Sequence, residues 1–172
     1  MSVNPKPPFQ AFTTTYTGIT NRIVVPIQVA DAFDPTVTPG TDVPWHQTQA
    51  LWDTGATNTV ITEATAAALG LVPAGMMRVT HAGGTELRST YVVNVLLPNR
   101  VLVTGIQASD CHDTVGNFGM IVGMDIISKG DLAITNFGGM TCMSFRIPSM
   151  ERIDYVREFN RKLFAGTNPN AP

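Results

Sequence analysis

The residues best suited to chemistry lie in one stretch, from Ala50 to Thr57, which reads Ala-Leu-Trp-Asp-Thr-Gly-Ala-Thr. Apolar residues lead into Asp53, and the small residues Thr54 and Gly55 follow it. Burying a carboxylate is costly unless it has hydrogen-bond partners. An Asp at the end of an apolar strand therefore indicates a carboxylate that backbone donors hold for acid–base chemistry.

Such a carboxylate becomes an acid–base device when a second carboxylate approaches it. Two carboxyl groups in contact share a proton, so one acts as base and the other as acid, and together they can activate water against an amide carbonyl. Gly55 lets the backbone come close and can point its N–H at Asp53, the Thr54 hydroxyl can tie the loop to a neighbour, and Ala56 leaves room for a substrate. The alternative is a turn Asp that caps its own backbone.

Two other groups of residues invite a chemical reading. Cys111, His112 and Asp113, together with Cys142, His46 and His81, contain metal-binding residue types. Their spacing matches no usual zinc pattern, so we predict neither a metal nor another cofactor. Asp125 opens a short helical run, where Asp commonly supports the helix start, and we expect it to be structural.

Short strands surround the Asp53 turn. We expect strands at Arg22–Ala30, where Pro26 requires an edge or a bulge, and at Gln47–Trp52. Thr62 is the expected N-cap of a helix ending at Leu69, with Gly70 in the left-handed position that closes helices. Further strand-like runs form two hairpins, one around Gly83-Gly84 and one around Gly138-Gly139. The pattern predicts an all-β barrel or sandwich.

The two ends of the chain differ from this middle part. We expect a flexible N-terminal arm over residues 1–15, a folded domain over 16–148, a helix over 149–164 and a disordered tail over 165–172. Ile153, Val156, Phe159 and Leu163 recur at helical spacing, and Pro148-Ser149 is the expected start of this amphipathic helix. Core packing is the first role for its apolar stripe, and a contribution to a dimer is the second.

Composition limits the possible partners and compartments. The 172 residues carry a net charge of −2, which gives no reason to expect nucleic acid or an anionic membrane as partner. No apolar run approaches the ~20 residues of a membrane span, and the N-terminus does not read as a signal peptide. The two cysteines form no disulfide framework. We expect a cytoplasmic protein with free thiols.

The order of three motifs resembles the retropepsin-like aspartic proteases, in the style of their cellular and bacterial single-domain members. The run from Leu51 to Ala56 is similar to the active-site strand of that family, and Ala82, Gly83, Gly84 and Thr85 lie where its flap tip lies. Ile121, Val122 and Gly123 match the motif that braces the catalytic loop. The resemblance covers roughly residues 23–147 and implies a retropepsin-like barrel with short helices after the active-site loop and after Gly123.

The resemblance also implies a mechanism and a partner. The chain has a single Asp-Thr-Gly, so an aspartic endopeptidase of this type would be a homodimer in which Asp53 of each subunit meets at the two-fold axis. Its substrate would be a polypeptide, and no metal or covalent intermediate would be needed. The alternative is a catalytically silent homodimer of the same fold that binds extended peptides by strand addition.

Three positions depart from the viral members of the family. Those members place acidic residues after the triplet that pair with an Arg beside the Gly of the bracing motif. Here these places hold Thr57, Asn58 and Met124, so the ion pair is absent.

Overall fold

The computed structural model describes residues 9–81, 83–112 and 117–165. Its strands are β1 (Gln10–Thr15), β2 (Val24–Asp31), β3 (His46–Trp52), β4 (Val60–Thr62), β5 (Gly75–His81), β6 (Gly84–Leu97), β7 (Val101–Cys111), β8 (Met120–Val122), β9 (Asp131–Thr135) and β10 (Cys142–Ile147). Its α-helices are α1 (Glu63–Ala68), α2 (Met124–Ile127) and α3 (Tyr155–Ala165), and its 3-10 turns are η1 (Gly40–Asp42), η2 (Pro98–Arg100) and η3 (Phe137–Gly139). The predicted tail, apart from residue 165, and the first eight residues of the predicted arm lie outside the described residues.

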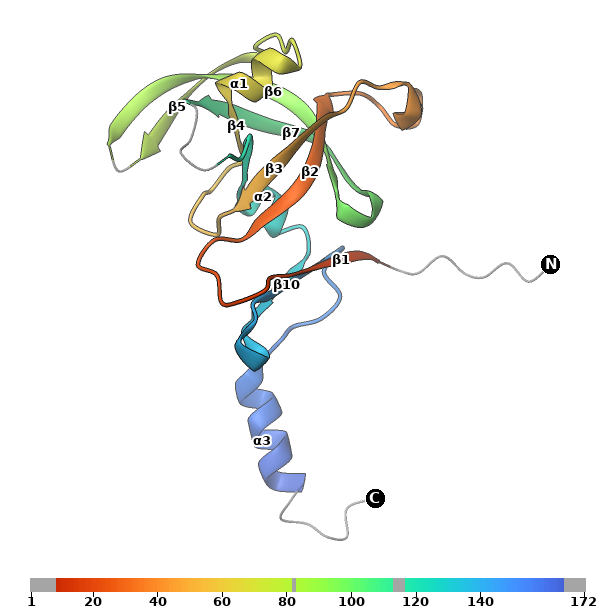
Figure 1. The fold of residues 1–172 in the computed structure, drawn as a ribbon, viewed down its shortest axis with the longest axis vertical. Helices are drawn as coiled ribbons and strands as arrows, with labels where there is room; N and C mark the ends of the chain where they lie inside the picture. Colours follow the sequence, from red (N-terminus) through yellow and green to blue (C-terminus); the bar gives the residue numbers. More distant parts are fainter. Residues whose placement is uncertain (1–8, 82, 113–116, 166–172) are drawn as a thin grey trace, which may run out of the picture.

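Six strands form a closed barrel in the order β2-β3-β8-β4-β7-β6, because β6 pairs again with β2. Strand β5 continues the sheet beyond β6 and forms a long hairpin with it (Figure 1). Alternate residues of β2, namely Val25, Ile27 and Val29, point into the barrel and are buried. The expected all-β barrel is confirmed.

Pro26 lies in the part of β2 where the lack of a backbone N–H disturbs the hydrogen bonding of the sheet least. Strand β6 pairs with β2 only from Gln28 to Asp31, whereas β3 pairs with β2 from Val24 onwards. Pro26 therefore belongs to the part of β2 that has one neighbouring strand, as its chemistry requires.

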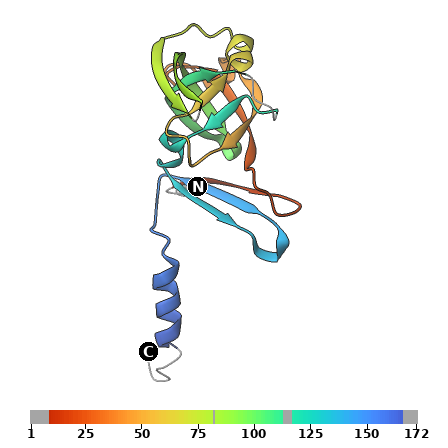
Figure 2. The ribbon, with the colours of Figure 1, turned by 90° about the vertical axis from the view of Figure 1, so that its left-hand side faces the viewer.

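A separate three-stranded sheet, in the order β1-β10-β9, lies beneath the barrel (Figure 2). The predicted boundary of the flexible arm at residue 15 is wrong for residues 10–15, because β1 pairs with β10 from Gln10↔Ile147 to Thr15↔Cys142. Phe12 of β1 is buried against Trp52 of β3 and Phe145 of β10, with ring centroids 5.8 Å and 6.1 Å away. This aromatic cluster joins the small sheet to the barrel.

The C-terminal helix begins six residues later than predicted, at Tyr155 rather than at residue 149. The Asp131 carboxylate accepts hydrogen bonds from the Ser149 hydroxyl and from the Met150 N–H, which hold this segment outside a helix. Asp154 then caps α3, because its Oδ1 accepts the Arg157 N–H at 3.0 Å. No helix in the described ranges is long and apolar enough to cross a bilayer.

Candidate active site

Asp53 follows directly after β3, at the point where that strand leaves the barrel. The Asp53 N–H donates to the Val122 carbonyl at 3.0 Å, and the Trp52 N–H donates to the Ile23 carbonyl at 2.8 Å. Strand β8 runs parallel to β3, with Leu51 beside Ile121 and Trp52 beside Val122. The structure thus brings two of the predicted motifs, the Asp53 turn and the Ile121–Gly123 segment, into direct contact.

The Asp53 carboxylate is half-buried and is held by its own turn. Its Oδ1 accepts the Gly55 N–H at 2.8 Å, and the Ala56 N–H donates to the Asp53 carbonyl at 3.2 Å. A Cβ at residue 55 would lie 3.1 Å from that same Oδ1, so Gly suits the close approach. An Asp that only closes a turn makes the same bonds, so the surroundings of the turn must distinguish the two readings.

The loop after Asp53 is fastened to the start of α2. The Met124 N–H donates to the Ala56 carbonyl at 2.8 Å, and the Asp125 N–H donates to the Thr57 carbonyl at 3.2 Å. A Cβ at Gly123 would come within 2.6 Å of the Asn58 backbone, closer than real Cβ atoms approach. Gly123 is therefore required for this contact.

Thr59 adds a further link between the loop and α2, and no local sequence pattern predicts this role. Its fully buried hydroxyl donates to Asp125 Oδ1 at 2.7 Å and accepts the Gly123 N–H at 3.2 Å. A hydrogen bond to a carboxylate is stronger than one between neutral groups. Thr59 and Asp125 thus connect the loop to α2, where the viral pattern would use an ion pair.

The predicted flap tip lies at the end of the β5–β6 hairpin. Gly83, Gly84 and Thr85 are exposed there, and Gly84 has a positive φ of 127°. The hydroxyls of Thr80 and Thr85 lie 3.0 Å apart across the hairpin. Ala82, the fourth residue predicted for the tip, lies outside the described residues.

A groove of about 520 Å³ separates this hairpin from the Asp53 loop. Its lining residues come from the loop and β4, from β5 and from β7: Gly55, Ala56, Thr57, Asn58, Val60, Met77, Arg78, Val79, Thr80 and Ser109. Met77 and Val79 are half-buried and alternate with exposed neighbours on β5. In the sequence, apolar Met77 and Val79 alternate with polar neighbours, a pattern that predicts two side chains on one face of a strand. The sequence alone did not identify these two residues as facing a groove.

A second cavity, of about 580 Å³, lies elsewhere on the barrel surface. Polar side chains of β2, β3 and the β6–β7 turn line it, among them Gln28, Gln47, Gln49, Asn99 and Arg100. None of the predicted catalytic-site residues is among its described lining residues. Position rather than volume therefore identifies the groove beside Asp53 as the candidate substrate site.

The base of the hairpin is tied to α1 by charged residues. Arg88 of β6 is mostly buried and contacts Glu63 at 3.4 Å as well as its neighbour Glu86. His112 Nδ1 lies 3.0 Å from the same Glu63 carboxylate. Within the described ranges, no three His, Cys, Asp or Glu side chains are arranged to hold a metal ion, and Asp113 lies outside those ranges.

Thr54 stands apart from this network. Its side chain is exposed, and its hydroxyl has no hydrogen-bond partner among the described residues. Thr54 therefore leaves an exposed hydroxyl next to Asp53 and Gly55.

A known protein family matches more than half of the sequence. Residues 42–129, just over half of the chain, match the family described as "gag-polyprotein putative aspartyl protease". The fold is similar to a retropepsin-like aspartic protease from Rickettsia conorii, at 12% identity and a TM-score of 0.49, over 81% of this chain and 95% of that one. It is also similar to the retroviral protease-like domain of Ddi1 from Leishmania major, at 16% identity and a TM-score of 0.43, over 79% and 99% of the two chains.

A viral structure is similar as well. The simian foamy virus protease aligns at 17% identity and a TM-score of 0.37, over 60% of this chain and 89% of that one. Among curated proteins the sequence has no significant match.

Proposed function

The chain belongs to the gag-polyprotein aspartyl protease family, and from this premise we propose that it is an aspartic endopeptidase that acts as a homodimer. The observation that carries the proposal is the state of Asp53. Its carboxylate is half-buried and receives the Gly55 N–H, yet it has no counter-charge among the described residues. A second carboxylate would share a proton with Asp53 and so form the acid–base pair. It must come from another subunit, because the chain contains one Asp-Thr-Gly.

The chemistry follows from two Asp53 side chains that share one proton. The ionised carboxylate takes a proton from a water molecule, whose oxygen attacks the amide carbon, while the protonated carboxyl gives its proton to the carbonyl oxygen. The resulting tetrahedral diol breaks its C–N bond as the amine leaves with a proton from one carboxyl of the dyad, while a hydroxyl of the diol returns its proton to the other carboxylate. The products are a carboxylic acid and an amine, and neither a metal nor a covalent intermediate is needed.

The remaining predicted residues have supporting roles in this proposal. Thr54 offers its exposed hydroxyl to the second subunit, and Gly55 and Ala56 form the floor of the groove. Ile121, Val122 and Gly123 brace the turn from below. The flap residues Ala82, Gly83, Gly84 and Thr85 would close over an extended peptide.

The groove also indicates how a polypeptide would bind. Among the described residues, strand β5 ends the sheet order and pairs with β6 alone, so its outer edge can take up an extended peptide by strand addition. Met77, Val79 and Val60 supply apolar surface for substrate side chains. Cys142 carries a thiol outside any disulfide, which suits a reducing compartment such as the cytoplasm.

The test is cleavage of a peptide library across acidic and neutral pH by the wild type, by Asp53→Asn and by a matched surface variant, Asp42→Asn. Asp42 is exposed and lies outside the groove. Cleavage by the wild type and by Asp42→Asn, with none by Asp53→Asn, is the expected result. Peptide binding without turnover in all three proteins would instead identify the silent peptide-binding module.

A mixing experiment tests whether two subunits share the site. When equal amounts of wild type and Asp53→Asn exchange subunits at random, the activity per wild-type chain should fall to about one half, because only wild-type pairs carry two carboxylates able to share a proton. Activity that is independent of the added variant, despite proven subunit exchange, would contradict the shared dyad.

A further inference from the structure

The groove beside Asp53 runs along the edge of strand β5. Residues 77–80 of β5 all line it, opposite the loop that follows Asp53. Because neighbouring side chains of a strand point to opposite faces, a groove that touches consecutive residues follows the edge of the strand rather than one face. A peptide added at this edge would place its own side chains alternately on the two faces of the hairpin.

The inner face of the hairpin is apolar along the edge strand. Met77 and Val79 of β5 are half-buried on this face, and Arg88 and Glu86 lie opposite them on β6. Arg88 contacts Glu63 of α1 at 3.4 Å, so this face is turned towards the folded body. The charges of the inner face are therefore paired with one another, and its free edge offers apolar side chains to a peptide.

The outer face of the paired segment carries one charged side chain among the described residues, that of Arg78. Arg78 is exposed and pairs in register with Leu87, which cannot neutralise it. None of the described carboxylates forms an ion pair with Arg78. Among the described residues that line the groove, Arg78 alone is charged. The edge therefore presents an unpaired positive charge to any peptide that binds there.

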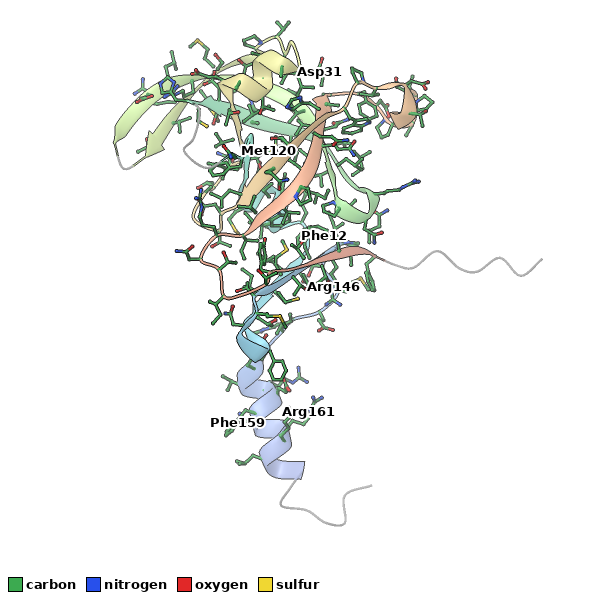
Figure 3. The ribbon with its side chains drawn as sticks, in the orientation of Figure 1. Phe12, Asp31, Met120, Arg146, Phe159 and Arg161 are labelled. Carbon is green, nitrogen blue, oxygen red and sulfur yellow. The ribbon has the colours of Figure 1, made fainter. Side chains whose placement is uncertain are left out.

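Other arginines lie elsewhere or are already paired. Figure 3 shows Arg146 on the small sheet and Arg161 on α3, both away from the β5–β6 hairpin. Both ribbon views show α3 projecting away from the barrel (Figures 1 and 2), and its apolar stripe is exposed, so the core packing expected for that stripe is wrong. Arg88 is mostly buried and contacts two carboxylates. Arg78 is thus the arginine that a peptide bound along β5 would meet.

Cross-strand geometry makes this charge selective. Side chains directly opposite each other on neighbouring antiparallel strands have Cβ atoms about 4.5–5.5 Å apart, where opposite charges attract and like charges repel. The peptide residue opposite Arg78 would lie on the outer face, and its two neighbours would point inwards beside Met77 and Val79. The matching segment is an acidic residue between two apolar residues.

We propose that Arg78 is a specificity residue, which selects an acidic side chain flanked by two apolar side chains in the bound polypeptide. This inference deepens the proposed function, because it rests on peptide binding in the groove beside Asp53 and names the class of sequence that the groove takes. Arg78 contributes no group to the acid–base pair, so its replacement changes which peptides bind and leaves the chemistry in place.

Peptide binding to Asp53→Asn measures the selectivity without cleavage. The probes are three fluorescein-labelled peptides with a central Val-X-Val segment in an uncharged Ser-Thr frame, where X is Glu, Gln or Lys. In fluorescence anisotropy the Glu peptide should bind about threefold more tightly than the Gln peptide and about tenfold more tightly than the Lys peptide. Added salt should narrow both ratios. Equal affinity for the three peptides, or no binding of any of them, would overturn the proposal.

A charge reversal tests Arg78 itself. In the Asp53→Asn background, Arg78→Glu should invert the order, so that the Lys peptide binds most tightly. Arg161→Glu makes the same change in net charge on α3, away from the groove, and should leave the order as it was. A purely structural role of Arg78 would weaken the three peptides alike. An order that Arg78→Glu does not invert would therefore overturn the proposal.

Cleavage by the wild type separates this inference from the proposed function. The values of kcat/KM for peptides with the same three segments should follow the order of binding. A wild type that cleaves all three equally well defeats the role of Arg78 alone. Binding whose order Arg78→Glu inverts, in a protein whose wild type cleaves nothing, defeats the proposed endopeptidase alone and leaves the selectivity of Arg78 established.

Discussion

Replacing Thr59 with Val is a direct test of how the candidate catalytic loop is held. Valine keeps the shape of threonine but lacks the hydroxyl that donates to Asp125 Oδ1 at 2.7 Å and accepts the Gly123 N–H at 3.2 Å. Since the side chain of Thr59 is fully buried, water cannot replace either bond without opening the loop.

The size of the effect follows from these two contacts. A hydrogen bond to a charged group is worth about 1.5–3 kcal/mol, and leaving a buried N–H without a partner costs about 1–3 kcal/mol. The extra methyl group of valine returns less than about 1 kcal/mol through apolar burial. We therefore expect Thr59→Val to lower the free energy of unfolding by about 3 kcal/mol.

Urea unfolding followed by tryptophan fluorescence measures this loss, because Trp52 is buried directly before Asp53. The matched control is Thr41→Val, which removes a hydroxyl that also contacts a carboxylate, Asp42 Oδ1 at 3.0 Å, but on the exposed surface. This control should change the free energy of unfolding by no more than about 0.5 kcal/mol.

A double-mutant cycle with Asp125→Ala isolates the contact itself. Thr59 and Asp125 should show a coupling energy of about 1–2 kcal/mol, because each variant removes the same hydrogen bond. Additive effects of the two variants, or a loss in Thr59→Val no larger than in Thr41→Val, would refute the bracing role of Thr59.

Three other perturbations have defined outcomes. Gly123→Ala should lower the free energy of unfolding by about 3 kcal/mol in urea titrations, since its Cβ would meet the Asn58 backbone at 2.5 Å; an unchanged midpoint would contradict the tight contact. Gly70→Ala should cost about 1 kcal/mol in the same assay, because residue 70 has a φ of +63°, and Gly18→Ala, with open space around it, is the control. Asp131→Asn should lower the Tm above about pH 5, with the difference from wild type shrinking towards pH 2. The hydrogen bonds from Met150, Ser149 and Arg146 lower the pKa of Asp131, so its stabilisation is present above the ordinary Asp pKa and is lost as pH falls; a difference independent of pH would contradict this.

Local patterns predicted the parts of the site that are made by neighbouring residues. Thr62 caps α1 by accepting the Thr65 N–H at 3.2 Å, and Gly70 has the expected positive φ. The all-β barrel and the resemblance to retropepsin-like proteases are confirmed by the strand order and by the family match. These features were predictable because capping, turn chemistry and alternation act over a few residues.

The parts that sequence reasoning missed depend on residues far apart in the chain. Strand β1 reads as a loose Thr-rich arm because its partner β10 lies about 130 residues away. Nothing in the sequence distinguishes Thr59 from the neighbouring threonines, because its hydrogen-bond partner Asp125 lies 66 residues further along the chain. The start of α3 was misplaced because the Asp131 carboxylate, rather than any local signal, holds Ser149 and Met150 out of the helix.

The pairing of β1 with β10 determines which part of the protein we expect to unfold first. Strand β1 binds the rest of the fold much as a peptide ligand would, through its pairing with β10 and the packing of the Phe12 ring. Because β1 is covalently attached to the protein, its effective concentration at this site is high. Its release is a local opening that needs less free energy than global unfolding. Because that opening uncovers Trp52, hydrogen exchange in β10 reports on a state in which the support directly before Asp53 is loosened.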